Sequence, residues 1–230
     1  MNISEIFYSL QGEGALTGMP SVFIRLSGCN LRCSWCDTKY ASWHPETEQR
    51  TIDAIIEEVQ THNCKYVVIT GGEPTLQPET IELTRQLKAL DKHITIESNG
   101  TIFSEGLLCD LLSLSPKLSH SVADSTEHPN ESALQEEQRI QLGALRNWID
   151  QYNYQLKFVV QSPEDIHEIQ DLLEEIDRSV PPDHVLLMPE GTDSETLLER
   201  SPDLIDACKK YGYRYCSRLH IDLFGNTRMT

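Results

Sequence analysis

Apolar residues recur along the chain at two spacings, one typical of strands and one typical of helices, and the two alternate for most of its length. Short apolar runs predict strands in "SVFIRLSG" (21–28), "KYVVITGGEP" (65–74), "HITIESNG" (93–100), "QLKFVV" (155–160) and "HVLLMPEG" (184–191). Helical spacing predicts helices in "TIDAIIEEVQTHN" (51–63), "PETIELTRQLKAL" (78–90) and "SPEDIHEIQDLLEEI" (162–176). We expect Thr51 and Ser162 as N-caps, with Pro78 and Pro163 at first helical positions.

This order of strands and helices favours an α/β fold, with a mostly parallel sheet and helices packed outside it. The chemically unusual residues follow the predicted strands: a cysteine-rich loop, "TGGEP", "ESNG", "SPK" and "MPEG". In parallel α/β folds, including β/α barrels, sites form at the carboxyl ends of the strands. We therefore expect one pocket that collects all five loops.

The polar and acidic stretch "SHSVADSTEHPNESALQEEQ", near residues 119–138, interrupts this order. Its composition predicts a surface insertion or mobile loop rather than a domain boundary. With 230 residues and no visible internal repeat, residues 1–230 are expected to form a single domain that carries this insertion.

The net charge of the chain limits the kinds of partner that it can bind. It has 36 acidic and 19 basic residues and a net charge of -17, which argues against a large non-specific contact with nucleic acid. No apolar run approaches the ~20 residues of a membrane span, and "MNISEIFYSLQGEG" lacks the regions of a signal peptide. We expect a cytoplasmic protein with no nucleic-acid or membrane partner, whose clustered thiols serve metal binding or catalysis rather than disulfides.

The segment "GCNLRCSWCDT" (28–38) places Cys29, Cys33 and Cys36 in a C-x3-C-x2-C pattern. Three thiolates are one fewer than a closed structural metal site takes. One interpretation is a zinc site completed by a residue elsewhere, such as His44. The interpretation that the spacing favours is a 4Fe–4S cluster held at three corners, with its fourth iron open to a ligand.

This cysteine pattern resembles that of the radical S-adenosylmethionine (radical SAM) superfamily. Trp35, directly before the third cysteine, and "TGGEP" (70–74) match the aromatic position and the glycine-rich SAM segment of that superfamily. The resemblance implies a partial, incomplete β/α barrel of the TIM type. It also implies that Cys29, Cys33 and Cys36 hold a 4Fe–4S cluster, and that the cluster and SAM generate a radical that takes a hydrogen atom from the substrate.

Nearly the whole chain, apart from the 119–138 stretch, is similar to the 7-carboxy-7-deazaguanine synthase family. The similarity is carried, in order, by "EIFYSLQGEG", "FIRLSGCNLRCSWCDT", "ESNGT", "SPK", "KFVV", "LMPEG" and "LHIDLFGNTR". It implies a carbon–nitrogen lyase of 7-deazapurine (queuosine precursor) biosynthesis. Such an enzyme contracts the ring of 6-carboxy-5,6,7,8-tetrahydropterin to 7-carboxy-7-deazaguanine and releases ammonia, using SAM catalytically with assistance from Mg2+.

The resemblance also implies roles for individual residues, none of them as an acid or base. Thr38 is expected to bind Mg2+ through its hydroxyl. Substrate contacts are implied for Leu10, Gln11, Gly12, Arg25 and Thr70, with the Arg25 guanidinium on the substrate carboxylate. SAM contacts are implied for Trp35, Cys36, Asp37, Gly72, Ser115, Pro116, Lys117, Met188, Pro189, Glu190 and Gly191, where Gly72 would let the backbone approach the ligand.

Some of these positions also have a simpler structural interpretation. Arg25 could be an ordinary ion-paired residue, and Thr38 could only cap the turn that follows the cysteines. Lys157, within a predicted strand, is expected to be structural rather than catalytic. The sequence leaves open whether His220 and Arg228 reach the pocket, and the tail "NTRMT" is expected to lie outside the site.

Two other functions compete with the synthase. A radical SAM activase that makes a glycyl radical on a partner enzyme predicts an exposed groove for a protein loop. A non-catalytic zinc or cluster-binding module predicts stable metal without SAM cleavage. A buried carboxylate clamp at Arg25 would instead indicate a small-molecule substrate. By resemblance, we also expect a homodimer and a reducing electron donor such as flavodoxin or ferredoxin.

Overall fold

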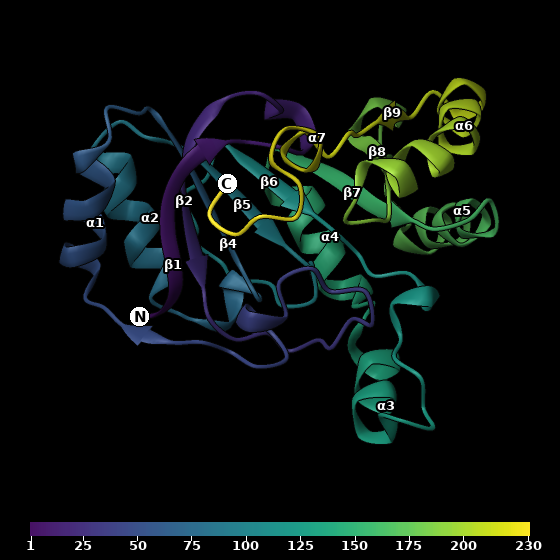
Figure 1. The fold of residues 1–230 in the computed structure, drawn as a ribbon, viewed down its shortest axis with the longest axis horizontal. Helices are drawn as coiled ribbons and strands as arrows, with labels where there is room; N and C mark the ends of the chain where they lie inside the picture. The colour runs from purple at the N-terminus through teal and green to yellow at the C-terminus, as the bar shows by residue number, and fades with distance from the viewer.

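The computed structural model describes residues 1–230 and contains one nine-stranded sheet (Figure 1). Its strands are β1 (Asn2–Leu10), β2 (Pro20–Leu26), β3 (Glu48–Gln49), β4 (Tyr66–Gly71), β5 (His93–Ser98), β6 (Leu111–Leu114), β7 (Tyr154–Val160), β8 (Val185–Pro189) and β9 (Arg214–Tyr215). Their spatial order is β3-β1-β2-β4-β5-β6-β7-β8-β9. β1 is antiparallel to both neighbours, and every pairing from β2 to β9 is parallel. Because β3 and β9 do not pair, the sheet stays open, which confirms the partial β/α barrel.

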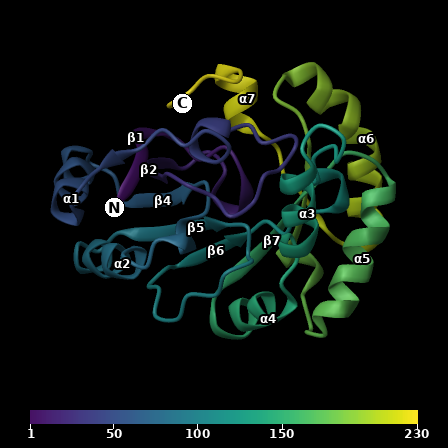
Figure 2. The ribbon, with the colours of Figure 1, turned by 90° about the horizontal axis from the view of Figure 1, so that it is seen from below.

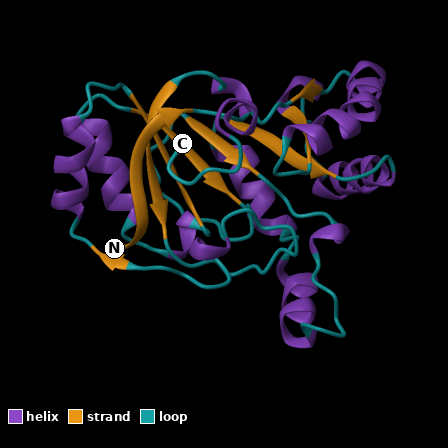
Figure 3. Ribbon diagram, viewed as in Figure 1, coloured by secondary structure: helices purple, strands orange, loops and turns teal.

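The helices are α1 (Ile52–Thr61), α2 (Thr80–Ala89), α3 (Pro129–Gln138), α4 (Leu142–Gln151), α5 (Glu164–Ile176), α6 (Ser194–Tyr211) and α7 (Leu219–Phe224). Five of the helices, α1, α2, α4, α5 and α6, lie outside the sheet, whereas α7 lies with the C-terminal segment on the cavity side, as Figures 2 and 3 show. Short 3-10 turns are η1 (Gly14–Leu16), η2 (Lys39–Ala41), η3 (Pro74–Leu76), η4 (Ser119–Ser121) and η5 (Pro182–His184). In Figure 1, α3 projects below the sheet, away from the other helices. No helix combines the length and the apolar character that crossing a membrane requires.

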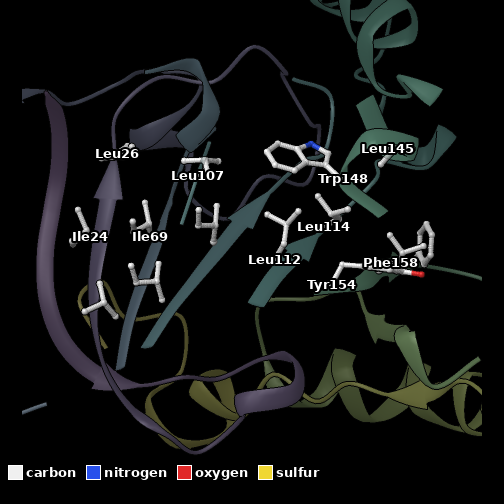
Figure 4. Close-up of a cluster of buried hydrophobic side chains, with 14 of the residues drawn as sticks. Ile24, Leu26, Ile69, Leu107, Leu112, Leu114, Leu145, Trp148, Tyr154 and Phe158 are labelled. Atoms are coloured by element: carbon white, nitrogen blue, oxygen red, sulfur yellow. The ribbon is translucent and has the colours of Figure 1, made fainter. Parts of the chain in front are cut away.

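Side chains of the parallel strands alternate between the main hydrophobic core and a cavity on the other face of the sheet. In β2, Ile24 and Leu26 belong to the core, whereas Arg25 lines the cavity. The same alternation in β7 directs Lys157 to the cavity. Figure 4 shows part of the core, where strand side chains pack with Trp148 of α4. The two-residue period of the strands therefore separates the residues that hold the fold together from those available for chemistry.

The predicted strands and helices are confirmed, with small shifts at their ends. Thr51 caps α1 through its side chain, as expected. Pro163, rather than Ser162, occupies the N-cap position of α5. α2 begins at Thr80, two residues after Pro78.

The sequence pattern does not predict β1, even though this is the longest strand. Ile6 and Phe7 are buried in succession, because the two faces of β1 pack against different neighbours. The pairing with β2 is also irregular between Ile3 and Glu5. Strict apolar–polar alternation is therefore absent from this strand. The helices α4, α6 and α7 were also not predicted from the sequence.

The stretch near residues 119–138, expected to be a surface insertion or mobile loop, contains η4 and α3, and most of its residues are exposed. α3 buries only Ser132 and Gln135. A helix that buries a serine and an amide, instead of an apolar stripe, shows none of the hydrophobic spacing by which helices are predicted. The Gln135 side chain contacts the cysteine loop.

Candidate active site

A cavity of about 510 Å³ lies on the face of the sheet opposite the main core. Its walls come from the strands, from the segments that follow β1, β2, β4, β5, β6 and β8, from the start of α7, and from the C-terminal tail. The loops after the parallel strands lie at their carboxyl end, where the sequence predicts the site. Because β1 is antiparallel and its Leu10 pairs with Pro20 at the start of β2, the segment after β1 reaches the cavity from the amino end of those strands. The volume is typical of small-molecule sites, which favours a small substrate over a protein loop.

The cysteine loop, which we define as residues 28–38, is tied to both η2 and η4. Its first residue, Gly28, donates its backbone N–H to the carbonyl of Ala41 at 2.8 Å. Ser34 donates its N–H to the carbonyl of Ser121 at 2.9 Å. From the other side, the Trp43 indole donates to the Cys33 carbonyl at 3.0 Å. The loop backbone is therefore fixed by contacts from both flanking segments.

All three thiols line the cavity, and none forms a disulfide. Burial raises the pKa of Cys29 to about 12, and the nearby Glu73 carboxylate adds to the shift. Burial also raises the pKa of Cys33, against the opposing effects of the Lys117 charge and a hydrogen bond from Gln135. Both groups are therefore thiols at neutral pH in the free protein, and iron binding must displace their protons.

The donor set fits an iron–sulfur cluster with a ligand beside it. No group of three or more His, Cys, Asp or Glu side chains is arranged to hold one metal ion, but the cysteines of a 4Fe–4S cluster each bind a different iron. The indole Nε1 of Trp35 is buried without a hydrogen-bond partner. An unpaired buried donor is costly, and Trp35 lines the cavity, so a ligand bound there could satisfy it.

Gly72 lines the cavity as expected, but its lack of a side chain has a reason that the sequence did not indicate. A Cβ at this position would lie 2.0 Å from the carbonyl oxygen of Gly28 and 2.6 Å from that of Ala41. Glycine is therefore required because the backbone of the cysteine loop packs directly on it. The expectation that Gly72 also lets the backbone approach SAM stays a prediction.

The residues assigned to the substrate lie together. Arg25 and Thr70 are aligned partners in the parallel pairing of β2 with β4, and both line the cavity with Leu10, Gln11 and Gly12. Gln11 donates its side-chain N–H to Glu97 at 3.3 Å. The Nε of Arg25 lies 2.7 Å from a Glu5 oxygen, so Arg25 is both ion-paired and in the site.

Most of the residues assigned to SAM also line the cavity, with three exceptions. Those that do are Trp35, Cys36, Asp37, Gly72, Ser115, Lys117, Met188 and Glu190. Pro116, Pro189 and Gly191 are not part of its wall. Pro189 instead lines a separate cavity of about 260 Å³, and the Gly191 carbonyl accepts a hydrogen bond from Arg218 at 2.5 Å.

A charged network, which we define as Glu13, Asp37, Glu97, Lys157 and Arg218, contributes to the same cavity. The Lys157 ammonium contacts the Glu13 carboxylate and lies 3.0 Å from Glu97. Arg218 lies 3.1 Å from Glu13 and also pairs with Asp37. Glu13 and Arg218 are 205 positions apart in the sequence, so no local sequence motif indicates this network.

The network keeps its members charged despite their burial. Burial would raise the pKa of Glu13, but Lys157 and Arg218 outweigh it and hold that pKa well below its usual range. Burial disfavours the charge on Lys157, but Glu13 and Glu97 outweigh it and hold its pKa above the ordinary value. Burial lowers the pKa of His220, which lies 3.9 Å from Glu13 and also lines the cavity. Lys157 therefore has a structural pairing and a position in the site.

The C-terminal residues Asn226–Thr230 line the cavity, so the expectation that the tail lies outside the site was wrong. Figure 1 shows this yellow segment passing in front of the strands. Arg228 donates to Glu5 at 2.7 Å, and its guanidinium lies 3.9 Å from the centre of the Tyr40 ring. A short polar tail has no periodicity, so only these contacts with distant residues reveal where it lies.

Comparisons with known proteins agree with this geometry. The Radical SAM superfamily matches residues 23–141 of the chain. The crystal structure of QueE from Escherichia coli superposes with a TM-score of 0.67, at 24% identity, over 95% of this chain and 94% of that one. The match to the family model, together with the cysteine loop, defines a radical SAM protein, and the superposition agrees with its partial-barrel fold.

Two relatives identify the family within that class. The 7-carboxy-7-deazaguanine synthase of Rhodopirellula baltica is 44% identical over 99% of this chain and 88% of its own. That of Halobacterium salinarum is 43% identical over 99% of this chain and 92% of its own. The chain belongs to the 7-carboxy-7-deazaguanine synthase family.

This membership settles the class of the protein and of its cofactors. It is an enzyme, and the radical SAM superfamily implies a 4Fe–4S cluster and SAM. The named relatives are synthases, which implies a small-molecule substrate and does not favour the glycyl-radical activase.

Proposed function

We propose that this protein converts 6-carboxy-5,6,7,8-tetrahydropterin into 7-carboxy-7-deazaguanine and ammonia. The observation that carries the proposal is a single cavity that joins the cysteine loop to Leu10, Gln11, Gly12, Arg25 and Thr70. Substrate and product differ by one molecule of ammonia, so the overall conversion needs no external oxidant. When bound between the cysteine loop and the rest of the cavity, the cluster and SAM would supply the radical chemistry that removes a hydrogen atom from the substrate.

Arg25 would hold the substrate carboxylate. Its Nε is occupied by Glu5 at 2.7 Å, which fixes the plane of the guanidinium and leaves the two terminal nitrogens for a carboxylate. Glu5 also accepts from Tyr40 at 2.9 Å. The rings of Phe7 and Phe23 are stacked with centroids 4.9 Å apart, and both line the cavity. They supply an apolar wall for the planar part of a pterin.

The polar edge of the pterin carries both N–H donors and oxygen or nitrogen acceptors, and the segment after β1 offers both kinds of partner. The Gln11 side chain donates to Glu97 at 3.3 Å and accepts from the Glu13 backbone at 3.2 Å. Glu13 and Glu97 are carboxylates within the cavity, which can accept from an amino group. This arrangement would fix the orientation of the ring.

SAM would bind beside the cysteine loop, against Trp35, Asp37 and Gly72. The unpaired Trp35 Nε1 supports this position. Thr38 would bind Mg2+ through its hydroxyl, which makes no capping hydrogen bond to η2. Mg2+ binds few protein ligands and takes oxygens from water and substrate, so one hydroxyl near the Arg25-bound carboxylate would suffice.

The resemblance to the family supports a homodimer and a separate electron donor, and the sequence itself supports a cytoplasmic location and a single domain. The protein would act as a homodimer in the cytoplasm, and a flavodoxin or ferredoxin would reduce the cluster. Residues 1–230 would work as one domain.

Anaerobic turnover tests the proposal. The protein is reconstituted with iron and sulfide, reduced with dithionite, and supplied with SAM, Mg2+ and 6-carboxytetrahydropterin, and the products are identified by mass. We expect 7-carboxy-7-deazaguanine without stoichiometric loss of SAM. Cleavage of SAM without that product would contradict the proposal and favour the activase, and binding of zinc without iron would contradict any radical chemistry.

A further inference from the structure

We propose that Gln135 of α3 is a positioning residue that fixes the cysteine loop and raises the reduction potential of the cluster through a hydrogen bond to the Cys33 sulfur. The inference goes beyond the proposed function, because it concerns the cluster and needs neither pterin nor turnover. Gln135 belongs to the segment 119–138, which the sequence predicts to be a surface insertion or mobile loop.

Three hydrogen bonds join this segment to the backbone and hydroxyl groups of two neighbouring loop residues. The Arg32 N–H donates to Gln135 Oε1 at 2.7 Å. Ser34 donates its N–H to the Ser121 carbonyl at 2.9 Å and its hydroxyl to the His120 carbonyl at 3.2 Å. Arg32 and Ser34 flank Cys33 on both sides, so these bonds fix the backbone that carries the middle cysteine.

Two ring contacts reinforce the same attachment. The Trp35 and His120 rings stack with centroids 5.7 Å apart, and Trp43 meets His128 edge-on at 5.1 Å. Trp35 belongs to the cysteine loop and Trp43 follows it, whereas both histidines belong to the 119–138 segment. The attachment therefore covers the middle of the loop, on both sides of Cys33, and continues at Trp43 beyond its end.

The orientation of the Gln135 amide is determined by its partners. Arg32 offers a backbone N–H, which can only donate, so the Gln135 oxygen must face it. The amide nitrogen then faces Cys33 Sγ at 3.4 Å and Ser121 Oγ at 3.1 Å. Gln135 is fully buried, and these three bonds engage both of its N–H groups and its oxygen. A glutamine at a solvated surface position would not need this arrangement.

An N–H group that points at a cysteine sulfur affects the reduction potential of the cluster bound to that sulfur. One-electron reduction by a low-potential donor oxidises the donor and adds one negative charge to the cluster, with no bond formed or broken. The positive end of an N–H dipole stabilises that charge, and hydrogen bonds to the sulfurs are among the factors that set cluster potentials. Loss of the Gln135 N–H should therefore make the cluster harder to reduce.

The test compares midpoint potentials, measured by dithionite titration followed by electron paramagnetic resonance, in the reconstituted full-length protein. Gln135→Met preserves the length of the side chain but removes its donors. We expect its reduced-to-oxidised ratio at a given potential to fall about tenfold, which corresponds to a midpoint about 59 mV more negative. Ser121→Ala removes the other acceptor of the amide, and Glu137→Gln changes the exposed face of α3. In both controls, the reduced-to-oxidised ratio at that potential should stay within twofold of the wild-type ratio.

Normal iron content together with an unchanged potential in Gln135→Met would overturn the proposal. Reduced iron uptake with an unchanged unfolding midpoint would support the positioning of Cys33, particularly if Gln135→Glu, which keeps the acceptor for Arg32, restores uptake. If Gln135→Met does not fold, Gln135→Glu carries the same measurement. Its potential should lie below that of Glu137→Gln, and an equal potential would overturn the proposal.

Discussion

The cysteine loop and the charged network line the same cavity but acquire their charge in different ways. In the loop, burial raises the pKa values of Cys29 and Cys33, so the sulfurs stay protonated until iron displaces the protons. In the network, Lys157 holds the Glu13 carboxylate ionised before any ligand arrives. Asp37, which directly follows Cys36 and pairs with Arg218, connects the two regions.

Because of this difference, the cysteines contribute mainly to cluster binding and the charged network contributes mainly to the free energy of folding. Removing a cysteine deletes a metal ligand but leaves no uncompensated charge behind. Removing a charge from the network leaves its partners buried without compensation, which costs folding energy even when no cofactor is bound. We therefore expect substitution of a cysteine to remove the cluster with little loss of stability. Removal of a charge from the network should instead lower stability while the cluster is retained.

The largest effect on activity is expected for Cys33→Ala. It removes one of three cluster ligands, so iron content, the paramagnetic signal of the reduced cluster and all turnover should be lost. The free energy of unfolding of the metal-free protein should change by no more than about 1 kcal/mol, because the substitution removes a single small buried sulfur. Iron analysis and urea unfolding measure the two effects. A Cys33→Ala protein that retains cluster would contradict the ligand assignment.

The largest effect on stability is expected for Lys157→Met. The side chain is 6% exposed and is paired with two carboxylates, so removing it should cost roughly 3–5 kcal/mol of unfolding free energy. Urea unfolding measures this loss. Lys209→Ala breaks an exposed pair with Asp206 and serves as the control, with an expected change below about 0.5 kcal/mol. Equal effects of the two variants would remove the distinction between the network and ordinary surface pairs.

Arg25→Ala should weaken substrate binding and leave the cluster intact. A hydrogen bond to a charged group contributes roughly 1.5–3 kcal/mol, so the Kd for the pterin should rise about 10- to 150-fold. Calorimetry under anaerobic conditions with SAM present gives this Kd, and the paramagnetic signal reports the cluster. Arg178→Ala, which removes an exposed pair with Asp150, is the matched control. Unchanged affinity in the Arg25 variant would contradict the carboxylate clamp.

A smaller effect is expected from acid. The folded pKa of Glu13 lies below its unfolded value of 4.5. Its stabilising contribution is therefore present above that value and is lost as the pH falls toward the folded pKa. One such group changes the unfolding free energy by at most about 1.4 kcal/mol per pH unit. Urea unfolding between neutral pH and about pH 3 should show a steeper decline in wild type than in Lys157→Met, where Glu13 has lost its main partner. Parallel declines would contradict this coupling.

The same contrast explains which parts of the site the sequence could predict. The cysteine loop and "TGGEP" are contiguous, and their residue types and spacing carry their chemistry, so Cys29, Cys33, Cys36 and Gly72 were placed in the site from sequence. The strands ending at these loops were recognised from their apolar runs. This part of the fold was predictable because both signals are local.

The rest of the site depends on contacts between distant residues. Glu13 and Arg218 meet only because the sheet brings β1 and the C-terminal segment together. Gln135 is buried by its polar partners, so the composition of its segment indicates the opposite of its location. The tail at Asn226–Thr230 likewise lacks any periodic pattern. Tertiary pairing of polar groups has no local spacing, and no reading of the sequence alone could find it.

The most direct test of the central claim is the stoichiometry of the anaerobic reaction with 6-carboxytetrahydropterin. We predict one ammonium ion for each 7-carboxy-7-deazaguanine formed, over many turnovers, with the amount of SAM constant. Accumulation of 5′-deoxyadenosine with falling SAM, and no release of ammonium from the pterin, would contradict the account.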